Sequence, residues 1–230
     1  MARTELAFFI AGTDTGAGKT VAALALMAAL AARGLRVAGM KPVASGCIET
    51  PDGLRNEDAL ALQAACSTRV PYEDVNPVAL PEPLAPQIAA ERVGRVIDGA
   101  RIETACARLR GGADAIVVEG VGGWRVPIAE DLDSADLVRR LGLDVILVVG
   151  LRLGCINHAL LTAEAIFADG LGLSGWIGNH PGARFEAAES SIAYLRSRLE
   201  APFLGELPPL NEMDSARLAQ HLDLAPLGLG

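Results

Sequence analysis

Residues 12–20 read GTDTGAGKT, which fits the spacing GxxxxGK[ST] of a phosphate-binding loop. Glycines let the backbone N–H groups of such a loop turn inward around phosphate oxygens, and the start of the following helix adds partial positive charge. In this pattern Lys19 contacts the β- and γ-phosphates, and the Thr20 hydroxyl is a ligand of Mg²⁺. The sequence therefore predicts a site for ATP and Mg²⁺. The loop residues expected to contact the nucleotide are Gly12, Thr13, Asp14, Gly16, Ala17, Gly18, Lys19 and Thr20.

Two acidic residues are candidates for completing the magnesium site, because Mg²⁺ prefers a near-octahedral shell of oxygen ligands. Glu119 follows the apolar run of residues 115–118 and precedes a glycine-rich turn, where the carboxyl end of a parallel strand faces the ligand crevice. A solvated charge at a strand end is the alternative. Asp58 is preceded by Glu57, and the alternative for this pair is to stabilise the first turn of a helix through the helix dipole.

Lysine is rare in this chain. Of 20 basic residues only Lys19 and Lys41 are lysine, and the others are arginine. An ammonium is a compact point charge, whereas a guanidinium is a bulkier planar fork, so a tight phosphate pocket favours lysine. Lys41 begins the segment KPVASG, which also offers the Ser45 hydroxyl and a flexible glycine and so suits an anionic intermediate with carboxylate-like oxygens. Coding bias and a surface lysine before a proline turn are the alternatives.

The elements that must position these residues alternate along the chain. Apolar runs predict strands at residues 5–11, 36–40, 115–118, 145–149 and 173–177. Helices are expected from the phosphate loop to about Arg33, where Gly34 ends the first, and at residues 133–142, 156–168 and 184–198. This alternation predicts an α/β fold: a mostly parallel sheet with helices on both faces, in one domain spanning residues 1–230. The five prolines of residues 71–86 predict an ordered loop without regular elements.

Composition excludes several classes of protein. The net charge of −8 and a pI near 4.9 argue against a nucleic-acid partner. The longest apolar run, residues 21–32, is shorter than the roughly 20 residues that a membrane-spanning helix needs. The N-terminal region also lacks a signal-peptide cleavage pattern, so we expect a cytoplasmic protein without a membrane partner. The four cysteines form no CxxC pair and predict neither a disulfide framework nor a zinc site.

Five segments together resemble the dethiobiotin synthetase family: residues 12–20, 41–46, 53–60, 118–124 and 148–158. The phosphate loop is shared by a large superfamily, but KPVASG, VEGVGGW and GCINHA in this order are specific, and the similarity extends to the GELP segment at residues 205–208. The resemblance implies a P-loop NTPase fold. It also implies an enzyme that joins 7,8-diaminononanoate, CO2 or bicarbonate, and ATP into dethiobiotin, ADP and phosphate in biotin biosynthesis.

The resemblance also implies roles for individual residues. Thr20, Asp58 and Glu119 match magnesium positions, which favours the metal role of Asp58 over the helix-dipole role. Asn179 matches an adenine contact, and the loop near Pro208 closes over the base. Gly16 departs from the family, because some relatives carry a larger or acidic side chain there. Positions that hold the carbamate and the transferred phosphoryl group are Lys19, Lys41, Thr15 and Ser45. Substrate-binding positions are Ser45, Gly122 and, from a neighbouring subunit of a homodimer, Gly154, Cys155, Ile156 and Asn157.

Other interpretations stay open at this point. An amidoligase of the cobyrinate or nucleotide synthetase kind shares this architecture but needs an ammonia source, and the chain has no room for a glutaminase domain. A P-loop switch ATPase typically carries a further lysine early in the loop, where this chain has Thr13, Asp14 and Thr15. Asn157 has the alternative of capping a helix N-terminus. His158 is given no catalytic role, since a histidine there fits a subunit contact equally well.

Overall fold

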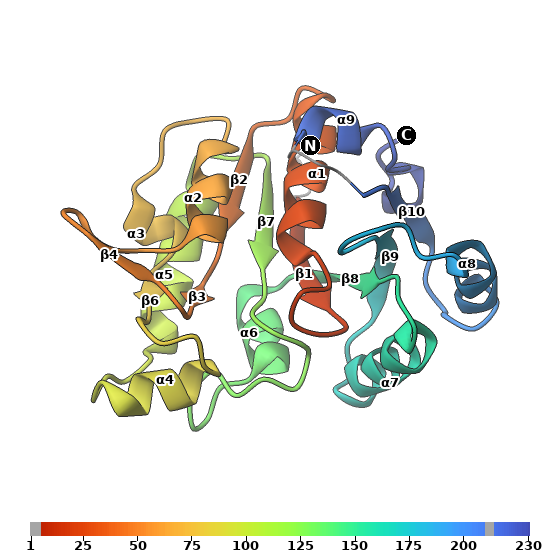
Figure 1. The fold of residues 1–230 in the computed structure, drawn as a ribbon. Coiled ribbons are helices and arrows are strands. Elements are labelled where there is room, and N and C mark those ends of the chain that lie inside the picture. Colours follow the sequence, from red (N-terminus) through yellow and green to blue (C-terminus); the bar gives the residue numbers. More distant parts are fainter. Residues whose placement is uncertain (1–5, 210–213) are drawn as a thin grey trace.

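The computed structural model describes residues 6–209 and 214–230 (Figure 1). Its strands are β1 (Leu6–Gly12), β2 (Val37–Met40), β3 (Val43–Ala44), β4 (Ile48–Thr50), β5 (Gly53–Arg55), β6 (Val78–Ala79), β7 (Ala115–Glu119), β8 (Asp144–Gly150), β9 (Leu173–Asn179) and β10 (Phe203–Leu207). Its helices are α1 (Lys19–Ala31), α2 (Glu57–Ala64), α3 (Tyr72–Val75), α4 (Pro86–Arg92), α5 (Gly99–Gly111), α6 (Ser134–Leu141), α7 (Cys155–Ala168), α8 (Ala188–Arg196), α9 (Ser215–Ala219) and the 3₁₀ turn η1 (Ala225–Leu227). None of the helices in these ranges is long and apolar enough to cross a membrane.

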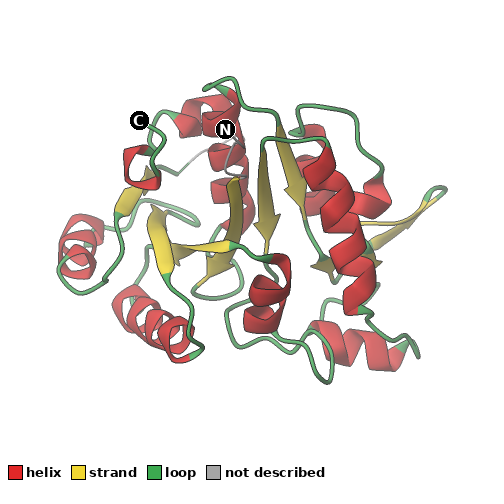
Figure 2. Cartoon of the chain, turned by 180° about the vertical axis from the view of Figure 1, so that it is seen from behind, coloured by secondary structure: helices red, strands yellow, loops and turns green. Residues whose placement is uncertain are grey.

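A six-stranded sheet in the order β10-β9-β8-β1-β7-β2 forms the centre of the molecule, and each neighbouring pair is parallel. Helices cover both faces: α1 lies in front of the sheet in Figure 1, and α5 and α6 lie in front of it in the reverse view of Figure 2. The predicted α/β fold is confirmed. Because all strands point the same way, the carboxyl ends of β1, β2, β7, β8 and β9 meet at one edge of the sheet.

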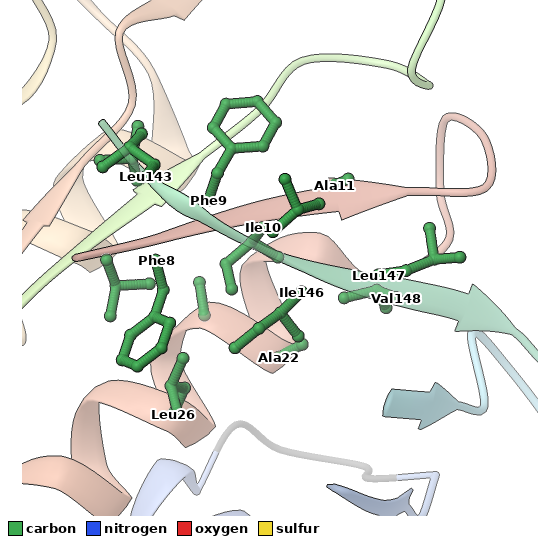
Figure 3. Packing of buried hydrophobic residues seen from close by; sticks show 14 of the residues in the cluster. Phe8, Phe9, Ile10, Ala11, Ala22, Leu26, Leu143, Ile146, Leu147 and Val148 are labelled. Carbon is green, nitrogen blue, oxygen red and sulfur yellow. The ribbon is translucent and has the colours of Figure 1, made fainter. Parts of the chain in front are cut away.

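The central strand shows why these residues form a buried parallel sheet. Successive side chains of β1 point to opposite faces, so Phe8 packs toward Leu26 of α1 while Phe9 lies on the other face (Figure 3). There Phe9 meets the ring of Trp124 edge to face, with centroids 6.2 Å apart. A strand covered on both faces needs continuous rather than alternating apolar residues, and β1 and β8 have them. This packing fixes the strand that leads into the phosphate loop.

Each of the five predicted strands is present, with ends that shift by one or two residues. Glu5, the predicted start of the first, lies outside the described residues. The first helix ends at Ala31, slightly earlier than expected, and Gly34 follows with φ 78° in the turn that closes it. The predicted helices correspond to α6, α7 and α8. Helix α5 and strand β10 were not predicted.

The prediction that residues 71–86 hold no regular element was wrong. The short helix α3 begins after Pro71, which occupies the N-cap, and ends before Pro77, while β6 follows and pairs with β3. Proline disrupts a helix interior but is tolerated at its first turn, where no N–H partner is lost. The prolines therefore lie at the ends of these elements and do not prevent them from forming. The expectation of order was right: Val75 and Leu80 are fully buried.

Candidate active site

The phosphate loop lies between the carboxyl ends of β1 and β8. Thr13 N–H donates to the Val148 carbonyl at 3.0 Å, and Gly150 packs so closely on Ala17 that a Cβ at Gly150 would lie 3.2 Å from the Ala17 Cα. Gly18 is the N-cap of α1 with φ 92°, a left-handed conformation that favours glycine. The loop consequently directs the N-terminus of α1 toward the carboxyl edge of the sheet, where an anion is favoured.

Lys19 is buried and points back over its own loop. Its Nζ donates to the Asp14 carbonyl at 3.2 Å and to the Gly122 carbonyl at 2.5 Å. Burial lowers the pKa of this ammonium to about 8, and the charge of Glu119 only partly opposes the shift. Since carbonyl dipoles give less compensation than a carboxylate, the ammonium is electrostatically ready for an anionic ligand.

Lys41, Glu119, Asp58 and Thr20 form a second polar cluster, which we call the acid–lysine cluster. Lys41 Nζ donates to Glu119 Oε1 at 2.5 Å and to Asp58 Oδ2 at 2.8 Å, and Thr20 Oγ1 donates to Glu119 Oε1 at 2.9 Å. Four separate segments supply these side chains: α1, the end of β2, α2 and the end of β7. The parallel sheet thus brings together residues up to 99 positions apart.

The charges of the acid–lysine cluster are strongly coupled. Burial alone would lower the pKa of Lys41, but the charges and hydrogen bonds of Glu119 and Asp58 together outweigh it and raise that pKa, so Lys41 stays an ammonium. Burial raises the pKa of Glu119, and Lys41 opposes this rise. Burial also acts to raise the pKa of the half-buried Asp58, but the charge and hydrogen bond of Lys41, the Thr20 hydroxyl and the Lys19 charge together lower it.

The acid–lysine cluster fits a hard divalent cation. Within the described ranges, Glu119 Oε2 is a buried oxygen without a hydrogen-bond partner, while Oε1 of the same carboxylate accepts from the Thr20 hydroxyl. Oxygen donors of this kind suit Mg²⁺, which keeps several waters and takes few protein ligands. The described residues contain no group of three or more His, Cys, Asp or Glu that could hold a metal. The oxygens of Thr20, Asp58 and Glu119 fit an ion that takes its remaining ligands from substrate phosphates and water.

A cavity of about 830 Å³ runs along this edge of the sheet. Lys19, Thr20 and the acid–lysine cluster line one end, which is joined by Ser45. Asn179 and Pro208 line the other end, which we call the base end, together with the short segment of residues 181–183. The volume lies within the range of small-molecule sites. One polar end with two ammonium groups and one mostly apolar end match the two ends of a nucleoside triphosphate.

The structure gathers most predicted site residues into this cavity. The predicted residues that line it are Thr15, Gly16, Gly18, Lys19, Thr20, Lys41, Ser45, Asp58, Glu119, Gly122, Asn179 and Pro208. Four loop residues, Gly12, Thr13, Asp14 and Ala17, do not line it. Gly154, Cys155, Ile156 and Asn157 do not line the cavity. Gly154 is the N-cap of α7, so the alternative that Asn157 caps this helix was wrong.

Three further residues at the site were missed by the sequence reasoning. Asn56 lines the cavity and caps α2 by accepting from the Ala59 N–H at 3.2 Å. Arg152 forms an ion pair with Asp14 of the phosphate loop. His180 lines the base end and bonds to Glu206 at 2.7 Å. Its position three residues after the predicted strand of residues 173–177 was an available signal, because polar residues there face the ligand edge.

The phosphate loop between the first strand and first helix of a parallel sheet defines the chain as a P-loop NTPase. Solved structures support this fold class. A MinC–MinD cell division complex from Aquifex aeolicus is similar with a TM-score of 0.57 and 17% identity over 95% of this chain and 92% of that one. The signal recognition particle receptor FtsY from Elizabethkingia anophelis has a TM-score of 0.55 and 14% identity over 94% of this chain and 63% of that one.

Sequence comparison narrows the class to a family. A family model described as AAA domain matches residues 7–217. The ATP-dependent dethiobiotin synthetase BioD of Xanthomonas oryzae pv. oryzae is 55% identical over 95% of this chain and 97% of its own length. The enzyme of the same name from Marinobacter nauticus is 48% identical over 96% and 97%. The chain belongs to the ATP-dependent dethiobiotin synthetase family, and it is an ATP-dependent ligase of biotin biosynthesis.

Proposed function

We propose that this enzyme closes a cyclic urea on 7,8-diaminononanoate, using CO2 and ATP and releasing dethiobiotin, ADP and phosphate. The observation that carries the proposal is the meeting of the phosphate loop with the acid–lysine cluster at one end of a cavity large enough for a nucleotide. A simple ATPase needs the phosphate loop and its metal. A second buried ammonium, Lys41, beside the Ser45 hydroxyl suits a second anionic group next to the γ-phosphate.

The proposed reaction divides into three steps on the substrate. One amine of the diamine adds to CO2 and loses a proton, which gives a carbamate. A carbamate oxygen then attacks the γ-phosphate, so ADP leaves and a mixed carbamic-phosphoric anhydride forms. The second amine attacks the anhydride carbonyl and phosphate departs. Since both nitrogens belong to one molecule, ring closure profits from high effective molarity and needs positioning more than a strong base.

The residues of the cavity serve these steps by charge and orientation. We assign Lys19 to the transferred phosphoryl group and Lys41, whose raised pKa keeps it charged, to the carbamate oxygens. The hydroxyls of Thr15 and Ser45 orient the same groups. Thr20, Asp58 and Glu119 would hold Mg²⁺. When bound, this ion neutralises charge on the phosphate oxygens.

We further propose that the chain is a single-domain cytoplasmic protein that acts as a homodimer. Residues 154–157 do not line the cavity of their own subunit, although the resemblance assigns them to the diamine. They form the start of α7, whose first N–H groups suit the carboxylate tail of the substrate. Leu153 beside them is 91% exposed. An exposed leucine next to a substrate-binding helix start is consistent with a subunit contact at this edge.

Subunit mixing tests the shared site. Lys19→Ala and Asn157→Ala are each expected to be inactive alone, and mixing them is expected to restore activity, because one site of the mixed dimer then carries both intact groups. Gel filtration and subunit exchange of tagged chains are measured in parallel. Dimers that exchange subunits but regain no activity would rule out the shared site for this pair.

The proposed reaction itself is tested by ADP release in a coupled assay. ADP release is expected to require the diamine and bicarbonate together. Release that needs neither would favour a switch ATPase, and release that needs ammonia would favour an amidoligase. Mass spectrometry of the product checks that a cyclic urea has formed.

A further inference from the structure

The base end of the cavity has two walls that come from different strands. Residues 181–183 continue from β9, and Pro208 and Pro209 continue from β10. Both walls are built from proline, glycine and alanine, which offer flat apolar surfaces and no charged side chain. Such surfaces suit the faces of an aromatic base rather than phosphates. The separation between these two walls decides how well a base fits between them.

One imidazole links the two walls. The side chain of His180 is fully buried, and its Nε2 lies 2.7 Å from Oε1 of Glu206 on β10. Its Nδ1 accepts from the backbone N–H of Phe185 at 3.2 Å, at the far end of the segment that forms the first wall. Because a backbone N–H can only donate, Nδ1 must be unprotonated, which places the ring proton on Nε2 as a donor to Glu206. Each ring nitrogen therefore holds a different part of the base end.

We propose that His180 is a positioning residue for the nucleobase, which sets the separation of the two walls. The bond from the Phe185 N–H to its Nδ1 holds the far end of the segment that contains the first wall. Its Nε2 links the end of β9 to Glu206, two residues before Pro208. The proposal rests on the proposed function only in placing ATP in this cavity, and it does not depend on the identity of the second substrate. The two hydrogen bonds of the His180 ring go to Glu206 and to the Phe185 N–H, and neither goes to the phosphate loop.

The physical reason is the weakness of the wall without this anchor. Residues 181–184 are exposed, so few packed contacts hold them in place. A hydrogen bond to a buried ring restricts such a segment before the ligand binds, so binding does not have to supply the conformational entropy of ordering it. Without it, a bound base must order the segment itself, and affinity for the base falls. The triphosphate contacts, which lie at the other end of the cavity, are unaffected.

The two hydrogen bonds of the ring can be tested separately. In His180→Asn the amide oxygen can replace Nδ1 as the acceptor, whereas in His180→Gln the amide nitrogen can replace Nε2 as the donor. His180→Ala removes both bonds. Dissociation constants for ATP and for inorganic tripolyphosphate are measured by titration calorimetry in Mg²⁺, without diamine or bicarbonate. Tripolyphosphate reports the phosphate end alone, since it carries no base.

The alanine variant is expected to bind ATP about threefold to tenfold more weakly, the usual net effect of losing about one hydrogen bond, and tripolyphosphate as tightly as the wild type. The asparagine and glutamine variants are expected to fall between. Glu206→Ala, at a position one-third exposed, should weaken binding of ATP alone, and Glu206→Gln, which keeps the acceptor, should restore it. The exposed His221 supplies a matched control, because His221→Asn should change neither constant.

Equal weakening of ATP and tripolyphosphate would overturn the proposal, as would ATP binding by His180→Ala and Glu206→Ala at wild-type strength. If the histidine variants do not fold, as judged by circular dichroism, the Glu206 pair decides the question. Turnover of the wild type without diamine would refute the proposed function but leave this binding test intact. The two ideas can therefore fail independently.

Discussion

Gly18 stands where the phosphate loop, helix α1 and Asn179 meet, and replacing it with alanine should show how tightly they are coupled. Gly18 has φ 92°, and a Cβ built there would lie 2.0 Å from Asn179 Nδ2. That nitrogen donates to the Ala17 carbonyl at 2.9 Å. An alanine at this position must therefore keep a left-handed backbone conformation, and its methyl group must also displace Asn179 from its hydrogen bond.

The two costs have different sizes. A left-handed conformation costs a residue with a Cβ about 1–2 kcal/mol. Losing the hydrogen bond of the buried Asn179 costs about 1 kcal/mol more. Gly18→Ala is thus expected to lower the free energy of unfolding by about 2–3 kcal/mol in urea titrations followed by circular dichroism. In an Asn179→Ala background the clash with the amide is removed, and the expected cost falls to about 1–2 kcal/mol, the size of the backbone strain.

Gly16 supplies the control within the same loop. It also has a positive φ, 79°, but a Cβ there would meet no atom within 4 Å. Gly16→Ala should cost only the backbone strain and show no coupling to Asn179→Ala in a double-mutant cycle. If Gly18→Ala costs as much without the Asn179 side chain as with it, the steric explanation is refuted.

Three further predictions concern charge at the phosphate end. Lys41→Ala should leave the ATP dissociation constant nearly unchanged and lower turnover by roughly 100-fold to 1000-fold, the usual effect of losing one preorganised donor; equal losses would make Lys41 a nucleotide-binding residue. Glu119→Gln should shift the titration of activity against Mg²⁺ to higher concentrations, whereas an unshifted titration with full activity would contradict a role of Glu119 at the metal. ATP binding should raise the pKa of Lys19 from about 8, so affinity should fall roughly tenfold from pH 7 to pH 9 as the free enzyme loses this proton; a flat profile in calorimetry would contradict it.

The ligand edge of the sheet was predictable from local patterns. Glu119 and Asn179 end the apolar strands β7 and β9, and Lys19 ends the glycine-rich loop after β1, while a parallel sheet brings the ends of its strands together whatever their separation in sequence. The same logic placed Lys41 after the second strand. Asp58 was different, because its contact with Lys41 depends on the β4–β5 hairpin that returns the chain to the sheet edge. No periodicity within its own segment carries that information.

The elements that escaped prediction have weak local signals. Strand β10 contains Gly205, and a glycine inside a short apolar run does not favour a strand. Its place is fixed instead by pairing with β9 and by the close approach of Gly205 to the His221 backbone, where a Cβ would lie 2.0 Å from the carbonyl oxygen. The link between His180 and Glu206 follows from that pairing alone. Such a contact becomes visible only when the sheet order is known.

The two lysines show why this chain keeps an ammonium at two positions and uses arginine elsewhere. Lys41 is 5% exposed, and two carboxylates bond to its one side-chain nitrogen. A planar guanidinium would need room for three nitrogens in the same place. Lys19 is paired with carbonyls rather than carboxylates, which is why burial lowers its pKa while that of Lys41 is raised. One ammonium is therefore a fixed charge and the other gains its full stabilisation only from an incoming anion. In the proposed mechanism, this difference in partners, rather than the shared residue type, would separate a group that orients the carbamate from a group that responds to the phosphates.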